Sequence, residues 1–227
     1  MIDNIVTYNY LQKRGVTRLC HFTKVKSLVH ILTSEDGILA TDFINQDIKQ
    51  QNDMERHDNA TNYVCCSIQY PNGWYWDLVK KRDDSQIFKE WVVLVIDLDI
   101  LKNVKFHFSA CNSAYKFGKY IRNDVTNISD VFNSPTIKMR YRPTSMLECC
   151  PTDDQAEILV YKNVPLRYIS GIIVGNEESA NNIGAILKTI GKDMSVFVSA
   201  SVCNTDWSRQ VRTGLIPQEK EYDYRGE

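Results

Sequence analysis

Gln155 and Glu157 lie two positions apart, where a polar segment of the chain meets a short apolar run. The preceding residues 152–154 favour a turn, and residues 158–161 are typical of a strand. Residues two apart in an extended segment point to the same side, so we expect both side chains at the mouth of a strand. A carboxylate there, beside an amide, can bind a sugar hydroxyl and stabilise positive charge that forms on a ribose ring.

A second polar group occurs near the N-terminus, where residues 17–22 predict a strand with His21 near its end. The apolar spacing of residues 25–32 predicts an amphipathic helix with Thr23 as its N-cap, and Gly37 ends the unit. A lone histidine near a strand end is more often structural than a ligand. Here a helix N-terminus follows, which favours phosphates and polar ligands, so we favour binding.

These two segments together resemble the DarT family of NAD-dependent DNA ADP-ribosyltransferases, and the resemblance runs from about residue 18 to about residue 198. It implies a single α+β domain over residues 1–227. In this ADP-ribosyltransferase-like fold a split mixed β-sheet forms the core, helices lie at the periphery, and NAD binds in the central cleft as a co-substrate. Periodicity alone shows only short strands mixed with helices.

The resemblance also implies roles for individual residues. By this resemblance Glu157 is the catalytic carboxylate. Arg56 takes the position of an essential loop arginine of the family, because it is the only arginine between Arg18 and Arg82. The residues expected to bind NAD are His21, Thr23, Gly37, Ser67 and Gln155. In the loop ahead of the glutamate, which selects the acceptor in this family, the residues expected to bind nucleic acid are Arg140, Tyr141 and Arg142. Asn112 stands where close relatives can carry a functional histidine.

The composition and net charge of the chain limit which classes of protein it can belong to. The 227 residues are 43% hydrophobic and 24% charged, which is typical of one soluble globular domain. A net charge of −1 argues against a general nucleic-acid coat protein, because phosphate binding usually requires a basic surface. The segment 116–142 is nevertheless rich in lysine and arginine and has few acidic residues, so it can meet a few phosphates or remain a solvated loop.

The seven cysteines include no C-x-x-C pair, and neighbouring cysteines do not have the spacing of a zinc site. We therefore expect reduced thiols and no metal. The sequence shows no export signal and no apolar run long enough to span a bilayer. We expect a cytoplasmic monomer with no membrane association.

Apolar patterns predict further elements along the chain, and the polar tail beyond Arg209 is expected to be frayed. The predicted strands are residues 63–68, 91–96, 106–108, 169–174 and 195–198, and the predicted helices are 2–13 and 177–190. Aromatic residues at 74–76 suit a surface that stacks on nicotinamide or a base, although such clusters more often belong to a core.

Three functions are compatible with these residues. The first is a toxin that transfers ADP-ribose to a base of single-stranded DNA, with a macrodomain antitoxin that removes the mark. The second is the same transfer to RNA or protein, which the acidic pI of about 6.4 favours slightly. The third is a non-catalytic NAD-binding module. The presence of both Glu157 and Arg56 argues against it.

Overall fold

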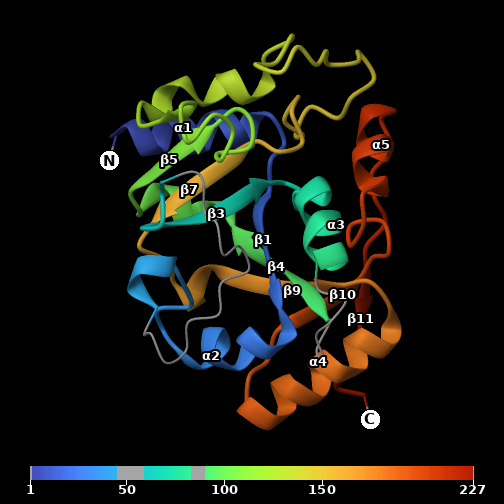
Figure 1. Ribbon diagram of the computed structural model, residues 1–227. Helices are drawn as coiled ribbons and strands as arrows, with labels where there is room; N and C mark the ends of the chain where they lie inside the picture. The colour runs from blue at the N-terminus through green and yellow to red at the C-terminus, as the bar shows by residue number, and fades with distance from the viewer. Residues whose placement is uncertain (1, 45–58, 83–89, 227) are drawn as a thin grey trace.

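A mixed β-sheet of nine strands forms the centre of the protein (Figure 1). The computed structural model describes residues 2–44, 59–82 and 90–226. In spatial order the strands are β11 (Lys220–Tyr222), β10 (Ser195–Val198), β9 (Ile169–Val174), β4 (Trp91–Asp97), β1 (Arg18–Lys24), β3 (Tyr63–Ile68), β7 (Glu157–Tyr161), β5 (Phe106–Ser109) and β6 (Ile121–Arg122). Only β9 and β10 run parallel to each other among these neighbours.

The sheet divides between β1 and β3. Strand β1 pairs with β4 along all of residues 18–24, but it pairs with β3 only at Leu19 with Ile68 and at Cys20 with Ser67. Beyond Cys20 the two halves separate, and His21 is the first residue past the junction. This geometry confirms the predicted split mixed sheet.

Helices lie around the sheet, as predicted (Figure 1). They are α1 (Ile2–Lys13), α2 (Leu28–Thr33), α3 (Gly73–Arg82), α4 (Glu177–Ile190) and α5 (Asp206–Arg212), and a small second sheet pairs β2 (Ile38–Leu39) with β8 (Asn163–Val164). Helix α4 connects the parallel strands and has a cap at each end. The Asn176 side chain accepts a hydrogen bond from the backbone N–H of Ser179, and Gly191 is left-handed with φ +66°.

Apolar side chains cover both faces of the central strands. Along β4, Leu94 and Ile96 belong to the larger core with α1, α2 and α4, whereas Trp91 and Val93 belong to a second core with Trp76 of α3. The continuous apolar run of β4 is therefore explained by burial on both sides, as expected for residues 91–96.

Two predicted details are wrong. Thr23 does not cap a helix, because it lies inside β1, pairs with Val92 and is 4% exposed. The tail is ordered as α5 and β11 rather than frayed: Tyr222 pairs with Val196, and Tyr224 is buried against α4. None of the described helices has the length and the apolar character needed to cross a lipid bilayer.

Candidate active site

Glu157 occupies the first position of β7, in the middle of one half of the sheet. It pairs with Ser67 of β3 on one side and with Ser109 of β5 on the other, and Ser67 also pairs with Cys20 of β1. Directly opposed residues in antiparallel strands project from the same face. The carboxylate therefore stands in a row of small polar side chains that crosses four strands and ends at the split.

A backbone donor fixes the carboxylate. The N–H of Ser113 donates to Glu157 Oε2 at 3.1 Å, and the Glu157 side chain is buried, with 8% of the residue exposed. Asn112 shapes the turn that supplies this donor, because its Oδ1 accepts a hydrogen bond from the N–H of Ala114 at 2.9 Å. Asn112 thus belongs to the support of the carboxylate.

His21 lies one residue beyond the β1–β3 junction. Its Nδ1 is 2.9 Å from the carbonyl oxygen of Cys65 on β3, so Nδ1 carries the hydrogen in this contact. His21 directly follows Cys20, the β1 end of the row that contains Ser67 and Glu157. The structure therefore brings His21, Ser67 and Glu157 onto three adjacent strands at the split.

Ser67 and Gly37 have evident structural partners. The Ser67 hydroxyl oxygen accepts a hydrogen bond from the N–H of Asn72 at 3.0 Å, and Asn72 Oδ1 accepts from the N–H of Tyr75, in the first turn of α3. Gly37 has φ +63° and packs against the carbonyl oxygen of Val164 in β8, away from the row on β7. Its glycine identity is explained by this close approach.

Gln155 lies in a turn rather than in the strand itself, contrary to the extended Gln-x-Glu segment that the sequence predicts. Lys138 Nζ donates to Gln155 Oε1 at 2.9 Å, and the N–H of Gln155 donates to Asp153 Oδ1 at 3.0 Å. Lys138 Nζ is also 3.8 Å from Asp153 Oδ2. Burial raises the pKa of the Asp153 carboxyl, which has no exposed surface. An ammonium group can only donate hydrogen bonds, so Lys138 orients the Gln155 amide with the amide oxygen toward the ammonium group.

Replacing Lys138 with methionine should reduce the rate of transfer about tenfold, because the Gln155 amide loses the charge-assisted hydrogen bond that sets its orientation. Steady-state rates and a titration of NAD check this prediction, and the dissociation constant for NAD should rise as well, because Gln155 is one of the residues expected to bind NAD. Lys102→Met, which removes a surface ion pair with Asp99, is the matched control. Equal rates for the two variants would contradict an orienting role for Lys138.

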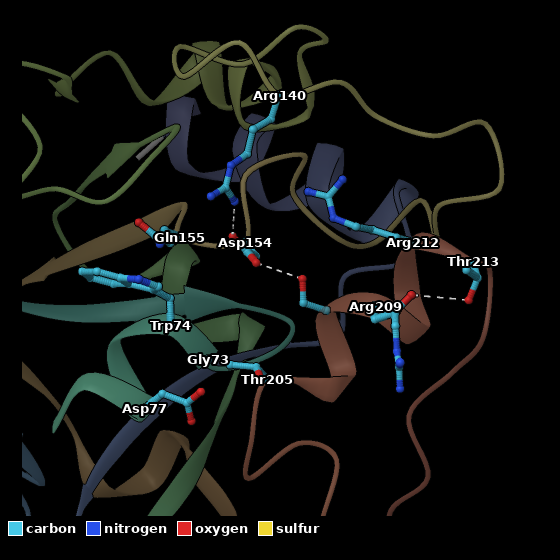
Figure 2. A pocket seen from close by; sticks show the side chains of 11 residues that line it. Gly73, Trp74, Asp77, Arg140, Asp154, Gln155, Thr205, Arg209, Arg212 and Thr213 are labelled. Carbon is cyan, nitrogen blue, oxygen red and sulfur yellow. Dashed lines mark hydrogen bonds and ion pairs between the residues drawn. The ribbon is translucent and has the colours of Figure 1, made fainter. Parts of the chain in front are cut away.

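A cavity of about 450 Å³ opens beside this network, between α3, α5 and the loop before β7 (Figure 2). Its lining residues are Gly73, Trp74, Asp77, Arg140, Asp154, Gln155, Thr205, Ser208, Arg209, Arg212 and Thr213. Figure 2 shows Gln155 between Trp74 and Asp154, and Asp154 joins the loop to α5 by accepting hydrogen bonds from Arg140 and Ser208. Glu157 itself is not among the lining residues.

The remaining predicted residues occupy different environments. Arg140 lines the cavity in an ion pair with Asp154 at 3.0 Å, and Tyr141 is 65% exposed. Arg142 instead braces its own loop, because its Nη1 and Nη2 atoms donate to the carbonyl oxygens of Cys150 and Leu147. Arg56 lies outside the described residues.

Sequence reasoning missed three residues of the site: Ser113, Lys138 and Asp153. Ser113 acts through its backbone N–H, which any residue except proline provides, so its identity carried no signal. Asp153 had a partial signal in its position two residues before Gln155. Lys138 was visible only as one cation in a basic segment, because its contact with Gln155 depends on the path of a loop without periodicity.

The comparisons with known proteins agree with this fold. The profile of a family described as "ssDNA thymidine ADP-ribosyltransferase, DarT" matches residues 20–207. Thermus sp. 2.9 DarT in complex with ADP-ribosylated ssDNA has a similar fold, with a TM-score of 0.60, 16% identity, and coverage of 83% of this chain and 96% of that chain. The same Thermus protein in complex with NAD+ gives a TM-score of 0.59 at 17% identity, covering 82% of this chain and 96% of that chain.

A further similar structure is Thermosipho africanus DarTG in complex with ADP-ribose, at a TM-score of 0.54 and 21% identity; the match covers 82% of this chain and 50% of that chain. A search of curated proteins finds no match. His21, Ser67, Gln155 and Glu157 all lie within the matched range of residues. The chain therefore belongs to the DarT family of NAD-dependent ADP-ribosyltransferases.

Proposed function

We propose that this protein transfers ADP-ribose from NAD to a base of single-stranded DNA, as a toxin whose mark a macrodomain antitoxin removes. The observation that carries the proposal is the buried carboxylate of Glu157, held by the Ser113 N–H in a row that ends at the split of the sheet. His21 stands at that split. Membership of the DarT family supports the same reaction.

In the proposed reaction the bond between nicotinamide and ribose breaks, and nicotinamide leaves with the bonding electron pair. The ribose then carries oxocarbenium-like positive charge. Glu157 accepts a hydrogen bond from a ribose hydroxyl and stabilises this charge through its own negative charge. A base nitrogen attacks the anomeric carbon and gives up its proton, for which Glu157 is the nearest assigned base. His21 and Thr23 bind the adenosine side of NAD.

The acceptor is proposed to enter from the side of the loop before β7. Gln155, with its oxygen held by Lys138, binds the sugar of NAD beside Glu157, while Arg140 and Tyr141 contact the strand. Arg56 positions the reacting ribose and the acceptor. A base in a duplex is stacked and paired, so transfer to a base favours a single strand. The DarT structure in complex with ADP-ribosylated ssDNA is consistent with this choice.

We further propose that residues 1–227 act as one domain and as a monomer in the cytoplasm. One sheet runs from β1 to β11 through the whole described chain, which supports a single unit. The seven cysteines, all among the described residues, are thiols rather than disulfides, which suits a reducing compartment.

Labelled NAD incubated separately with single-stranded DNA, RNA and protein tests the acceptor. The expected result is label on DNA alone, with release of the label when a macrodomain hydrolase is added. Label on RNA or protein would replace the proposed acceptor. Absence of label on every acceptor, together with intact NAD binding, would instead support a non-catalytic NAD-binding module.

A further inference from the structure

Cys149 and Cys150 are adjacent in the chain, and their sulfur atoms lie 3.8 Å apart. Cys149 is partly exposed, whereas Cys150 is buried, with 1% of the residue exposed. Cys65 is the other partly exposed cysteine of the seven. The proposed transfer reaction uses none of these thiols. A partly exposed thiol with a second, buried thiol in contact is an arrangement that can take part in redox chemistry.

Two guanidinium groups hold the backbone on either side of Cys149. The Nε and Nη2 atoms of Arg14 donate to the carbonyl oxygen of Glu148 at 3.2 Å and 3.0 Å. Nη1 of Arg142 donates to the carbonyl oxygen of Cys150 at 2.6 Å. The hydrogen bond with the Cys150 thiol and the two nearby cations lower the pKa of the Cys149 thiol. This environment favours the thiolate, which is the form that reacts with oxidants.

The two cysteines lie on the segment that leads into the proposed catalytic residues Gln155 and Glu157. Thr152 and Asp153 follow the pair and have no exposed surface. The carbonyl oxygen of Thr152 accepts a hydrogen bond from Arg212 at 2.9 Å, and Asp153 Oδ1 accepts one from the N–H of Gln155 at 3.0 Å. Because this segment is packed and hydrogen-bonded, a change in the backbone of the pair should displace Gln155.

We propose that Cys149 and Cys150 form a redox-sensitive pair, which a peroxide converts reversibly into a disulfide that slows transfer. The Cys149 thiolate attacks one peroxide oxygen, the O–O bond breaks, and a sulfenic acid forms while hydroxide leaves and takes up a proton from solvent. The Cys150 thiol then attacks the sulfenic sulfur, the S–S bond forms, and a second water leaves. The two sulfur atoms together give up two electrons, and these reduce the peroxide to water.

Closing the disulfide requires the backbone of residues 149–150 to change. The sulfur atoms must approach from 3.8 Å to about 2.05 Å. Adjacent Cα atoms are about 3.8 Å apart across a trans peptide, less than the roughly 4.4–6.8 Å of most disulfides. The change should break the hydrogen bond from Arg142 to the Cys150 carbonyl oxygen. The same departure from ordinary geometry makes the bond easy to reduce, so the oxidation should be reversible.

The test treats the reduced protein with hydrogen peroxide and maps every cysteine by peptide mass spectrometry without reduction. A cross-link between Cys149 and Cys150, seen as the loss of two hydrogen atoms, should form before any oxidation of Cys65. The rate of transfer should fall roughly ten- to a hundredfold as the cross-link accumulates, because small displacements of a positioning residue are costly. Dithiothreitol should restore both the thiols and the rate.

Three variants separate the two thiols. Cys149→Ser should keep the wild-type rate of transfer and lose its sensitivity to peroxide. Cys150→Ala should instead accumulate a sulfenic acid at Cys149, which dimedone labels. Cys203→Ala, which changes a buried cysteine of the second core, is the matched control and should stay sensitive to peroxide.

Oxidation of Cys65 ahead of Cys149 would overturn the proposal, as would a complete cross-link with an unchanged rate of transfer. Both results leave the proposed function intact. The order of oxidation is measured without a transfer assay, and only the effect on rate rests on the proposed function. Failure of the proposed function would therefore be seen separately, as the absence of wild-type transfer to single-stranded DNA.

Discussion

Replacing Glu157 with alanine should reduce the rate of ADP-ribose transfer about a thousandfold while NAD still binds. A carboxylate about 4 Å from a cationic sugar contributes roughly 4 kcal/mol at an effective dielectric constant near 20. Each ~1.4 kcal/mol of transition-state stabilisation is tenfold in rate. Because the positive charge develops only as the bond to nicotinamide breaks, the loss should appear in the rate and not in ground-state binding.

Single-turnover transfer rates and a calorimetric titration of NAD measure the two quantities separately. Glu157→Gln keeps the shape of the side chain and an oxygen for the Ser113 N–H but removes the charge, so it should be nearly as slow as the alanine variant. Glu148→Ala, which removes a carboxylate from the preceding loop, is the control. A residual rate above about a tenth of wild type in Glu157→Ala would exclude Glu157 from the mechanism.

Replacing Gly37 with alanine should lower the free energy of unfolding by about 3 kcal/mol. The new Cβ would lie 2.2 Å from the carbonyl oxygen of Val164 and 2.8 Å from the backbone nitrogen of Leu166. Neither backbone atom can withdraw without breaking the contact between Gly37 and the β2–β8 sheet. The left-handed φ of +63° adds its own cost for a residue with a side chain.

Gly191→Ala separates these two causes. Gly191 has nearly the same φ, +66°, but a Cβ added there would meet no atom within 4 Å, so its substitution should cost only about 1 kcal/mol. Urea denaturation of both variants gives the comparison. Equal losses of unfolding free energy in Gly37→Ala and Gly191→Ala would mean that the close approach of Gly37 to Val164 does not contribute to the cost of the substitution.

The elements that follow from local pattern were predictable. Strand β3, strand β9 and helix α4 occur at the predicted residues. An apolar run defines each strand, and apolar residues at helical spacing between a polar cap and a glycine define the helix. Glu157 and His21 were candidates because each adjoins an apolar segment and because of the resemblance to the DarT family, and their roles remain a prediction. The split between β1 and β3 came from the resemblance to the DarT family and not from any period.

The features that depend on distant contacts were not predictable. The polar tail forms β11 because it adds to the edge of β10, and Tyr224 is buried because Gly184 of α4 leaves room for its ring. Thr23 resembles a helix cap in the sequence, yet strand pairing with β4 extends through it. Lys138 reaches Gln155 across a 17-residue separation in a loop whose path no local pattern defines.

The most direct test of the proposed acceptor uses one oligonucleotide in two forms, single-stranded and annealed to its complement. After incubation with NAD and the protein, intact mass and nuclease digestion to nucleosides identify where ADP-ribose is attached. Transfer to an unpaired base predicts one nucleoside type that carries ADP-ribose on its base in the single strand, with little or no product in the duplex. Equal modification of both forms, or attachment to a phosphate terminus instead of a base, would contradict it.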